Sequence, residues 1–212
     1  MTTVIKSKEL IKMKILIIYS NHHAGNFNAD LLDGIREHFV KKGDEVAIRD
    51  LYQQNFDPVL RTRDFEMISA GETPEDILKE QSFVKWADVM LFIYPIWWGG
   101  MPAIMKGYID KVFAWGFAYK SNGNGVYPLL TGKRAMIINT LGQSRAEYEK
   151  GMFQAMDRIN NEGIFGFCGI ELISQNYFAS IHSITDQQKR ENIKQAIESL
   201  ESVRNPVMSK HT

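Results

Sequence analysis

One stretch of sequence decides the fold of this chain: Val89-Met90-Leu91-Phe92-Ile93-Tyr94-Pro95-Ile96-Trp97-Trp98-Gly99-Gly100-Met101-Pro102-Ala103-Ile104-Met105-Lys106-Gly107. It begins with a nearly continuous apolar run at residues 89–94, which is typical of a β-strand covered on both faces. It ends in a segment with helical periodicity that extends over residues 102–113. The stretch therefore predicts a buried strand, a short loop and a helix.

The loop of this stretch carries two adjacent tryptophans and two glycines. A short loop buries two neighbouring indole rings poorly, so Trp97 and Trp98 are unusual core residues. Gly99 and Gly100 let the backbone approach a ligand closely. The loop favours a site for a flat aromatic ligand, with an indole against the ring face and backbone N–H groups at its edge. The alternative is one core tryptophan beside an exposed one.

The rest of the chain alternates short apolar runs with helical patterns. Four further strands are predicted at residues 15–19, 45–49, 134–140 and 171–175, and helices at residues 28–42, 75–86, 102–113, 148–160 and 186–203. This alternation predicts an α/β fold in which a parallel sheet has helices on both faces. Right-handed crossovers then bring the carboxyl ends of all strands to one edge, where such folds bind ligands.

Three loops leave that edge, at residues 20–28, 95–101 and 140–147. The first loop joins a strand to a helix N-terminus, whose backbone N–H groups can hold a phosphate with the help of Ser and Asn side chains. It contains no Lys or Arg, so binding would rest on amides and the helix dipole, and an ordinary capped turn is the alternative. The third loop has hydroxyl and amide donors and is followed by Tyr148, which is able to hydrogen-bond a reacting centre.

Composition excludes several classes of function. Lys and Arg together number 25, as do Asp and Glu, so the net charge is zero and no nucleic-acid partner is expected. His22 and His23 are adjacent and lack a carboxylate or Cys at ligand spacing, so no metal site is predicted. The lone Cys168 is interpreted as a small buried hydrophobic residue, which fits a reducing compartment.

The chain is predicted to be one cytoplasmic domain. No apolar run approaches the roughly 20 residues that span a bilayer, and the start of the chain does not resemble a signal peptide. Residues 1–13 are expected to form an N-terminal extension, residues 14–205 the domain and residues 206–212 a C-terminal tail. The long connections at residues 50–74 and 114–133 are expected to be functional or to lie at an interface.

Motifs spread along residues 13–200 carry a resemblance to a known family. They are Gly25-Asn26-Phe27-Asn28, Asp50-Leu51-Tyr52, Asn55-Phe56-Asp57-Pro58, Asp76-Ile77 to Glu80-Gln81, Ala87-Asp88, Pro95-Ile96-Trp97-Trp98, residues 101–107, Asp110-Lys111-Val112-Phe113, Gly116-Phe117-Ala118-Tyr119 and Phe167-Cys168-Gly169. With them the chain resembles the NAD(P)H:quinone oxidoreductase (DT-diaphorase) family of flavoproteins. The resemblance implies a flavodoxin-like three-layer sandwich with a five-stranded parallel sheet in the strand order 2-1-3-4-5.

The resemblance also implies a cofactor site and a homodimer. It implies FAD, with FMN as the alternative, because residues 50–74 resemble the segment that shelters the adenine half in FAD-using members. The implied active-site tyrosine is Tyr148, whereas the histidine that follows it in the family is absent near residues 152–154. The residues expected at the cofactor come from all three loops: Asn21, Asn26, Phe27, Asn28, Pro95, Ile96, Trp97, Trp98, Gly99, Asn139, Thr140, Leu141 and Gly142.

The function implied by the resemblance is two-electron transfer from NAD(P)H, through the flavin, to a quinone or a related acceptor. Because one site serves both substrates, ping-pong kinetics are expected. The alternatives are a flavodoxin-like electron carrier, a regulatory flavin-binding module, and a reductase of azo or nitro compounds. The preference between NADH and NADPH and the physiological acceptor are left open by the sequence.

Overall fold

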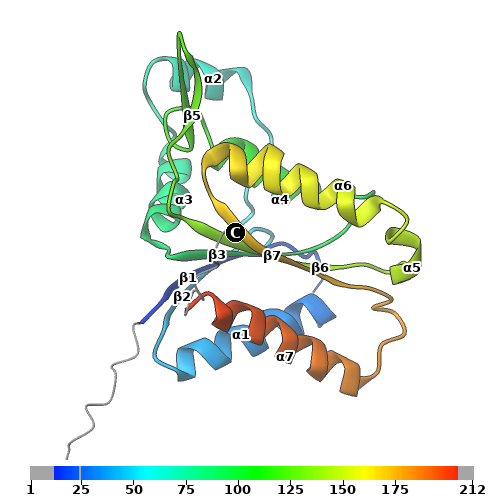
Figure 1. Cartoon of the computed structure of the whole chain (residues 1–212). Helices are drawn as coiled ribbons and strands as arrows, with labels where there is room; N and C mark the ends of the chain where they lie inside the picture. Colours follow the sequence, from blue (N-terminus) through cyan, green and yellow to red (C-terminus); the bar gives the residue numbers. More distant parts are fainter. Residues whose placement is uncertain (1–11, 24, 205–212) are drawn as a thin grey trace, which may run out of the picture.

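A computed structural model describes residues 12–23 and 25–204 of the chain. A five-stranded parallel sheet lies at its centre, in the spatial order β2-β1-β3-β6-β7 (Figure 1). Its strands are β1 (Lys14–Tyr19), β2 (Glu45–Asp50), β3 (Val89–Pro95), β6 (Arg134–Thr140) and β7 (Glu171–Phe178). The predicted α/β class and parallel sheet are therefore confirmed.

The strand order 2-1-3-6-7 replaces the predicted order 2-1-3-4-5. The sequence did not reveal β4 (Tyr119–Asn122) and β5 (Gly125–Pro128), which form a separate antiparallel hairpin between β3 and β6. Every residue of these two strands is exposed or half-buried, so no apolar pattern marked them. The five predicted strands themselves keep the predicted neighbours, with the hairpin outside their sheet.

Helices cover both faces of the sheet, which makes three layers (Figure 1). One face packs against α1 (Phe27–Lys41) and α7 (Asp186–Ser202), and the other against α3 (Glu75–Trp86) and α4 (Ala103–Val112). Side chains alternate along the strands, since successive residues point to opposite faces. In β1, for example, Ile15 and Ile17 contact the core under α1 and α7, whereas Leu16 and Ile18 contact the core under α3 and α4.

Two helical regions differ from the prediction. The helix predicted at residues 148–160 is divided into α5 (Arg145–Tyr148) and α6 (Met152–Arg158), followed by a π-helix (Ile159–Phe165) and a short 3-10 helix (Gly166–Cys168). Gly151 divides α5 from α6 because its φ of 129° is incompatible with a helix. The other difference is α2 (Thr62–Ser69), a helix missed inside the long connection at residues 50–74.

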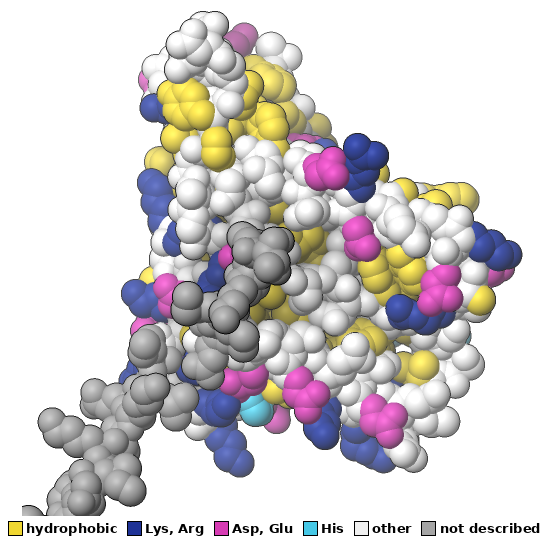
Figure 2. Space-filling view, in the orientation of Figure 1, with side chains coloured by type: hydrophobic (Ala, Val, Ile, Leu, Met, Phe, Trp, Pro, Cys, Tyr) yellow, Lys and Arg dark blue, Asp and Glu magenta, His cyan; other side chains and the backbone are white. Residues whose placement is uncertain are grey.

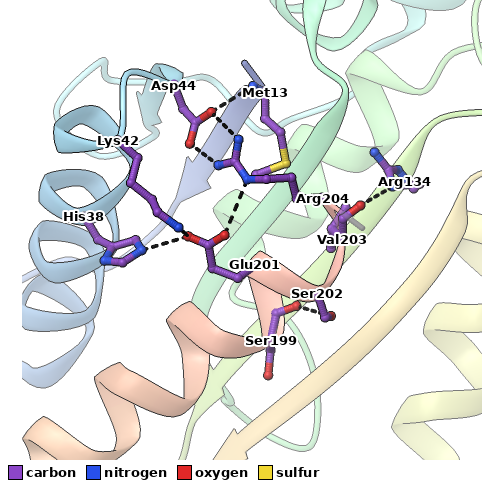
Figure 3. A network of polar contacts seen from close by, with 10 residues as sticks. All are labelled: Met13, His38, Lys42, Asp44, Arg134, Ser199, Glu201, Ser202, Val203 and Arg204. Atoms are coloured by element: carbon purple, nitrogen blue, oxygen red, sulfur yellow. Dashed lines mark hydrogen bonds and ion pairs between the residues drawn. The ribbon is translucent and has the colours of Figure 1, made fainter. Parts of the chain in front are cut away.

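The two ends of the described chain meet at the amino edge of the sheet. The Asp44 carboxylate accepts hydrogen bonds from the Met13 backbone N–H at 2.8 Å and from the Arg204 guanidinium at 3.0 Å (Figure 3). Of the predicted extension and tail, residues 1–11 and 206–212 lie outside the described residues. Within the described part, no helix is both long and apolar enough to cross a membrane.

Candidate cofactor site

The three predicted loops lie next to one another at the carboxyl edge of the sheet, because β1, β3 and β6 are neighbours. Backbone hydrogen bonds tie the loops together at their roots. The Ser20 N–H donates to the Ile93 carbonyl at 3.0 Å, and the Ile96 N–H donates to the Thr140 carbonyl at 2.8 Å. The strand order reverses between β1 and β3, so these loops surround the position where doubly wound sheets bind ligands.

The double tryptophan sits on a tight turn. The Trp97 N–H donates to the Gly100 carbonyl at 3.1 Å, and the Gly100 N–H donates to the Trp97 carbonyl at 3.0 Å. The two residues between them, Trp98 and Gly99, have φ values of 51° and 73°, as in a type I′ turn. A bulky residue in this region is strained, and such strain concentrates at functional sites. The turn leaves the Trp98 indole completely exposed at the carboxyl edge.

An aromatic group joins the first loop to the tryptophan turn. The His22 ring lies 5.4 Å from the Trp97 ring and 6.4 Å from the ring of Tyr52, which follows β2. Three rings from three separate loops therefore provide flat apolar faces beside the first loop. The sequence did not show this group, because His22 and Tyr52 are 30 residues apart and neither belongs to a periodic pattern.

The first loop forms a capped helix start. Asn26 is the N-cap of α1, and its side-chain oxygen accepts hydrogen bonds from the backbone N–H groups of Asn28 and Ala29. The Asn21 side-chain amide donates to the same oxygen at 3.1 Å, which holds the two ends of the loop together. The positive end of the α1 dipole consequently lies at the first loop, at the carboxyl edge of the sheet.

Several predicted site residues turn their side chains into the protein. Phe27 packs against Phe178 in the core, and Ile96 and Leu141 share a small apolar cluster at the foot of the site. Side chains placed this way face the core, so only the backbone of these residues is directed toward the site. Pro95 and Asn139 are also buried: Pro95 is the last residue of β3, and the Asn139 amide donates to the Tyr94 carbonyl at 3.3 Å and accepts from Gln175 at 2.9 Å.

Three buried side-chain oxygens around the site lack a hydrogen-bond partner within the described residues. They are the Ser20 hydroxyl at the end of β1, the Asn28 side-chain oxygen in the first turn of α1 and the Thr140 hydroxyl at the end of β6. A buried polar atom without a partner costs about 1–3 kcal/mol, so such atoms are normally satisfied by a ligand or water. Their position under the three loops fits a ligand with several polar atoms.

A cavity of about 210 Å³ lies behind the tryptophan turn, between α4 and the π-helix. Gly99, Gly100 and Met101 form its wall on the side of the turn, and Tyr94 and Asn160 line it from β3 and the π-helix. Burial raises the pKa of the Tyr94 phenol to about 12. Hydrogen bonds with Asn139 and Asn160 lower this pKa, but burial is the larger effect. Tyr94 therefore stays protonated at the wall of the cavity.

Tyr148 lies at the end of α5, half-buried beside the site. Its ring lies 5.4 Å from the ring of Phe153, which in turn lies 4.2 Å from the ring of Tyr177. Residues 152–154 hold no histidine, and Met152 instead reaches the tryptophan turn, its Cε 2.8 Å from where a Cβ on Gly99 would stand. The aromatic ladder fixes the ring of Tyr148 next to the third loop.

One residue near the site was missed by the sequence prediction. His182 lies in a fourth loop at the same edge, between β7 and α7, and its Nε2 is 2.8 Å from where a Cβ on Gly142 would stand. The sequence contained a signal for this loop, because the fifth predicted strand is parallel to the others and the loop after it must also leave the carboxyl edge.

Within the described residues, the site offers no cluster of metal ligands. No group of three or more His, Cys, Asp or Glu among those residues could hold a metal ion.

Comparison with known proteins agrees with this geometry. The family model of the flavodoxin-like fold matches residues 13–203. An uncharacterized NAD(P)H oxidoreductase of Haemophilus influenzae is 34% identical over 186 residues, which cover 87% of this chain and 92% of that protein. A ribosyldihydronicotinamide dehydrogenase [quinone] of Mus musculus is 29% identical over 198 residues, which cover 84% of this chain and 86% of the mouse protein.

Solved structures share the fold over most of their length. An NAD(P)H:quinone oxidoreductase of Methanothermobacter marburgensis aligns with a TM-score of 0.78 at 22% identity, covering 92% of this chain and all of that one. The general stress protein 14 of Treponema denticola, solved in complex with FMN, aligns with a TM-score of 0.61 at 17% identity, covering 91% of this chain and 98% of that one. The predicted resemblance to NAD(P)H:quinone oxidoreductases is thereby confirmed.

Proposed function

This chain belongs to the family with the flavodoxin-like fold, and from that premise we propose that it is a flavin-dependent NAD(P)H:quinone oxidoreductase. The observation that carries the proposal is the set of unpartnered oxygens of Ser20, Asn28 and Thr140 beneath an exposed tryptophan turn. Its relatives that are named NAD(P)H oxidoreductase and dehydrogenase [quinone] support the same reaction.

The residues fit a flavin in three parts. Asn21, Asn26 and Asn28, with the backbone of Phe27, would hold the phosphate at the positive end of α1. The isoalloxazine would lie against the tryptophan turn, with the backbone of Pro95, Ile96, Trp97 and Gly99 at its edge and the Trp98 indole at its face. Asn139, Thr140, Leu141 and Gly142 would border its other edge.

When bound, the flavin supplies two-electron transfer between NAD(P)H and a quinone in two half-reactions. The protein contributes position and polarity: the backbone N–H groups of Trp98, Gly99 and Gly142 would face the pyrimidine edge, where negative charge develops on reduction. Tyr148, held by Phe153, would donate a hydrogen bond to the substrate. One site at the carboxyl edge would serve both substrates in turn, so ping-pong kinetics are expected.

The proposal is tested by steady-state oxidation of NADH and NADPH with menadione as acceptor. Parallel double-reciprocal lines at varied menadione are expected, because NAD(P)⁺ leaves before the quinone enters. A yellow protein that oxidises neither nicotinamide with menadione or with an azo or nitro acceptor would identify an electron carrier or a binding module instead.

We propose FAD, with FMN as the alternative. FAD carries an adenine beyond its phosphates, and the rings of His22, Tyr52 and Trp97 beside the first loop provide faces on which it can stack. FMN has no second ring system and would leave these faces unused. Mass spectrometry of the cofactor released by heat separates the two, and FMN in the extract would contradict this choice.

We also propose a homodimer, as the family resemblance implies. Apolar side chains are exposed over α2, the β4–β5 hairpin and the neighbouring loops, at the upper end of Figure 2. Exposed apolar patches of this kind commonly mark interaction surfaces. A groove of about 420 Å³ runs between α2 and α4 in the same region. The exposed apolar residues of this surface are Phe65, Trp115, Val126, Tyr127, Leu129 and Phe167.

Light scattering after size exclusion tests the dimer. Phe65→Lys is expected to yield monomers, because it places a charge in the middle of the apolar surface. Val40→Lys is the matched control, since Val40 is as exposed as Phe65 but lies on α1, on the other face of the sheet. A monomeric wild-type protein, or a Phe65→Lys dimer, would contradict this part of the proposal.

We also propose that the protein is located in the cytoplasm. The lone Cys168 is a free, buried thiol, and no disulfide is present to require an oxidising compartment. Fractionation of cells that express the natural protein would test this.

A further inference from the structure

We propose that His182 contacts the electron acceptor and donates the proton that the reduction of a quinone consumes. The inference deepens the proposed function and rests on it. Its basis is the loop between β7 and α7, which the structure brings to the same edge as the three cofactor loops.

The His182 loop is fastened to the third cofactor loop along its length. The Leu141 N–H donates to the Phe178 carbonyl at 3.0 Å, and the Ile181 N–H donates to the Leu141 carbonyl at 3.3 Å. The Ser180 N–H donates to the Gln143 carbonyl at 2.9 Å. These bonds extend the pairing of β6 and β7 beyond the strands, so the two loops form one unit and their relative position is fixed.

A tight turn fixes the backbone that carries the imidazole. Ser180 has a φ of 56°, in the left-handed region that residues other than Gly, Asn and Asp seldom adopt. The Ser183 N–H donates to the Ser180 carbonyl at 2.9 Å, and the Ser183 hydroxyl donates to the same oxygen at 3.1 Å. Ile181 and His182 are the two central residues of this turn. The backbone is strained at Ser180, and strain is commonly retained where position matters.

The imidazole rests on the backbone of Gly142. Its Nε2 and Cδ2 lie 2.8 Å and 3.0 Å from where a Cβ at residue 142 would stand, so only glycine admits the ring in this position. His182 is exposed, and within residues 12–23 and 25–204 it has no hydrogen-bond or ion-pair partner. An exposed imidazole beside Gly142, which borders the proposed flavin, is free to meet an acceptor.

The chemistry requires a proton donor here. A quinone becomes a hydroquinone by gaining two electrons and two protons, and hydride transfer delivers both electrons with only one proton. The second proton must reach the other quinone oxygen from a protein group or water. Imidazole is suited to this because it gains and loses a proton near neutral pH. The His182 ring, once deprotonated, is reprotonated from solvent at its exposed edge.

Other candidate donors are less suited. Tyr94 is fully enclosed, and its pKa is raised to about 12 by burial. The Tyr177 hydroxyl already donates to Asp157 at 2.8 Å, and burial raises its pKa strongly. Met152, Phe153 and Gln154 occupy the positions where the sequence lacks the expected histidine. His182 supplies from a different loop the imidazole that this segment does not contain.

The test is stopped-flow reoxidation of the reduced holoprotein by two acceptors. Menadione takes up protons, whereas ferricyanide takes up one electron at a time and no proton. His182→Gln keeps a polar side chain of similar reach but removes proton transfer. We expect reoxidation by menadione to slow about 100-fold, in the range typical of a lost general acid, while ferricyanide reacts at the wild-type rate. His38→Gln is the matched control, since His38 lies on α1 near Glu201.

Two outcomes of these kinetics overturn the inference. Unchanged menadione rates in both His182→Gln and His182→Ala would show that no proton comes from this ring. Equal slowing with both acceptors would show that the variants disturb the loops and not proton delivery. If the wild-type protein binds no flavin and oxidises no NAD(P)H, the proposed function fails first and this inference fails with it.

A second readout does not depend on activity. In the ¹⁵N-histidine NMR spectrum of the oxidised holoprotein, the His182 signals are identified by their absence from His182→Gln. Addition of menadione, which oxidised flavin has no electrons to reduce, is expected to shift these signals. Gly142→Ala, which displaces the ring, is expected to remove that shift. Unshifted His182 signals at saturating menadione would contradict contact with the acceptor.

Discussion

Trp97 and Gly100 exchange two backbone hydrogen bonds, of 3.1 Å and 3.0 Å, across a turn whose two central residues both have positive φ. The second of the tryptophans, Trp98, therefore occupies a position that normally belongs to Asn or Gly. The left-handed conformation costs a residue with a Cβ about 1–2 kcal/mol, and the fully exposed indole makes no packing contact that offsets this cost. The protein retains a strained, solvent-exposed tryptophan at the centre of its proposed cofactor site.

This relationship predicts the effect of replacing Trp98. Trp98→Gly is expected to keep the turn, because glycine adopts its φ readily, and to weaken flavin retention about tenfold or more by loss of the stacked indole. Flavin affinity is measured by ultrafiltration of the reconstituted protein. Trp115→Ala is the control, since Trp115 is also exposed but lies in the groove beside α4. Equal losses of flavin affinity in the two variants would show that the Trp98 indole does not contact the flavin.

Gly107 provides a test of the packing that supports the tryptophan loop. It lies in α4, and a Cβ there would stand 2.3 Å from the backbone oxygen of Pro58. The connection after β2 is thereby held against α4. Gly107→Ala is expected to lower the free energy of unfolding by about 1–3 kcal/mol, as overpacking does, in urea denaturation. Gly123→Ala, where nothing lies within 4 Å, is expected to be neutral, and a neutral Gly107→Ala would refute the contact.

The amino edge of the sheet predicts an acid-sensitive contribution to stability. Burial raises the pKa of Glu201, but hydrogen bonds with Lys42 and His38 outweigh it and lower the pKa overall (Figure 3). A carboxylate whose folded pKa is lowered stabilises the fold above its unfolded pKa, near 4.3, and this contribution is lost as the pH falls through the folded pKa. Glu201→Gln is expected to lower the free energy of unfolding by about 1 kcal/mol at pH 7.

The same variant should lose less stability on acidification than the wild type. Urea denaturation at pH 7, 5 and 3 measures both curves, and the gap between them is expected to close as the pH drops below about 4. Glu198→Gln is the matched control, because Glu198 lies on the same helix with a largely exposed side chain. A gap that stays constant with pH would show that Glu201 contributes through packing and not through its charge.

Cys168 is predicted to be an inert thiol in the folded protein. It is buried, and burial raises its pKa to about 11, so the reactive thiolate is scarce at pH 8. Ellman's reagent is expected to react at least about 100-fold more slowly with the native protein than with the protein in urea, by the ratio of thiolate fractions and by restricted access. Rapid reaction in native buffer would show that the 3-10 helix around Cys168 opens readily.

Much of the fold could be predicted because its signals are local. The run at residues 89–94, and the run at residues 134–140 with its apolar centre at residues 135–138, gave strand bounds within one residue of those of β3 and β6. The hairpin of β4 and β5 carries no such signal, since its side chains face solvent on both sides. The break at Gly151 was missed because a lone glycine is compatible with a helical pattern and its φ is set by tertiary contacts.

The sequence predicted which loops form the candidate site, but not the direction in which their side chains point. Parallel topology brings the three loops together, yet it does not say that Phe27, Ile96 and Leu141 point into the core while Trp98 points out. The contact between His182 and Gly142 joins residues 40 positions apart and depends on the turn at Ser180, which no sequence pattern announced. Such contacts arise from packing between loops, which hydrophobic periodicity and amino-acid composition do not predict.

The central claim is that this protein is a flavin-dependent NAD(P)H:quinone oxidoreductase. The most direct measurement is an anaerobic titration of the purified holoprotein with NADH or NADPH, followed by menadione, while the visible absorbance of the flavin is recorded. The account predicts that one equivalent of at least one nicotinamide bleaches the flavin and that one equivalent of menadione restores its colour. A flavin that neither nicotinamide bleaches, or a purified protein that retains no flavin after reconstitution with FAD or FMN, would contradict it.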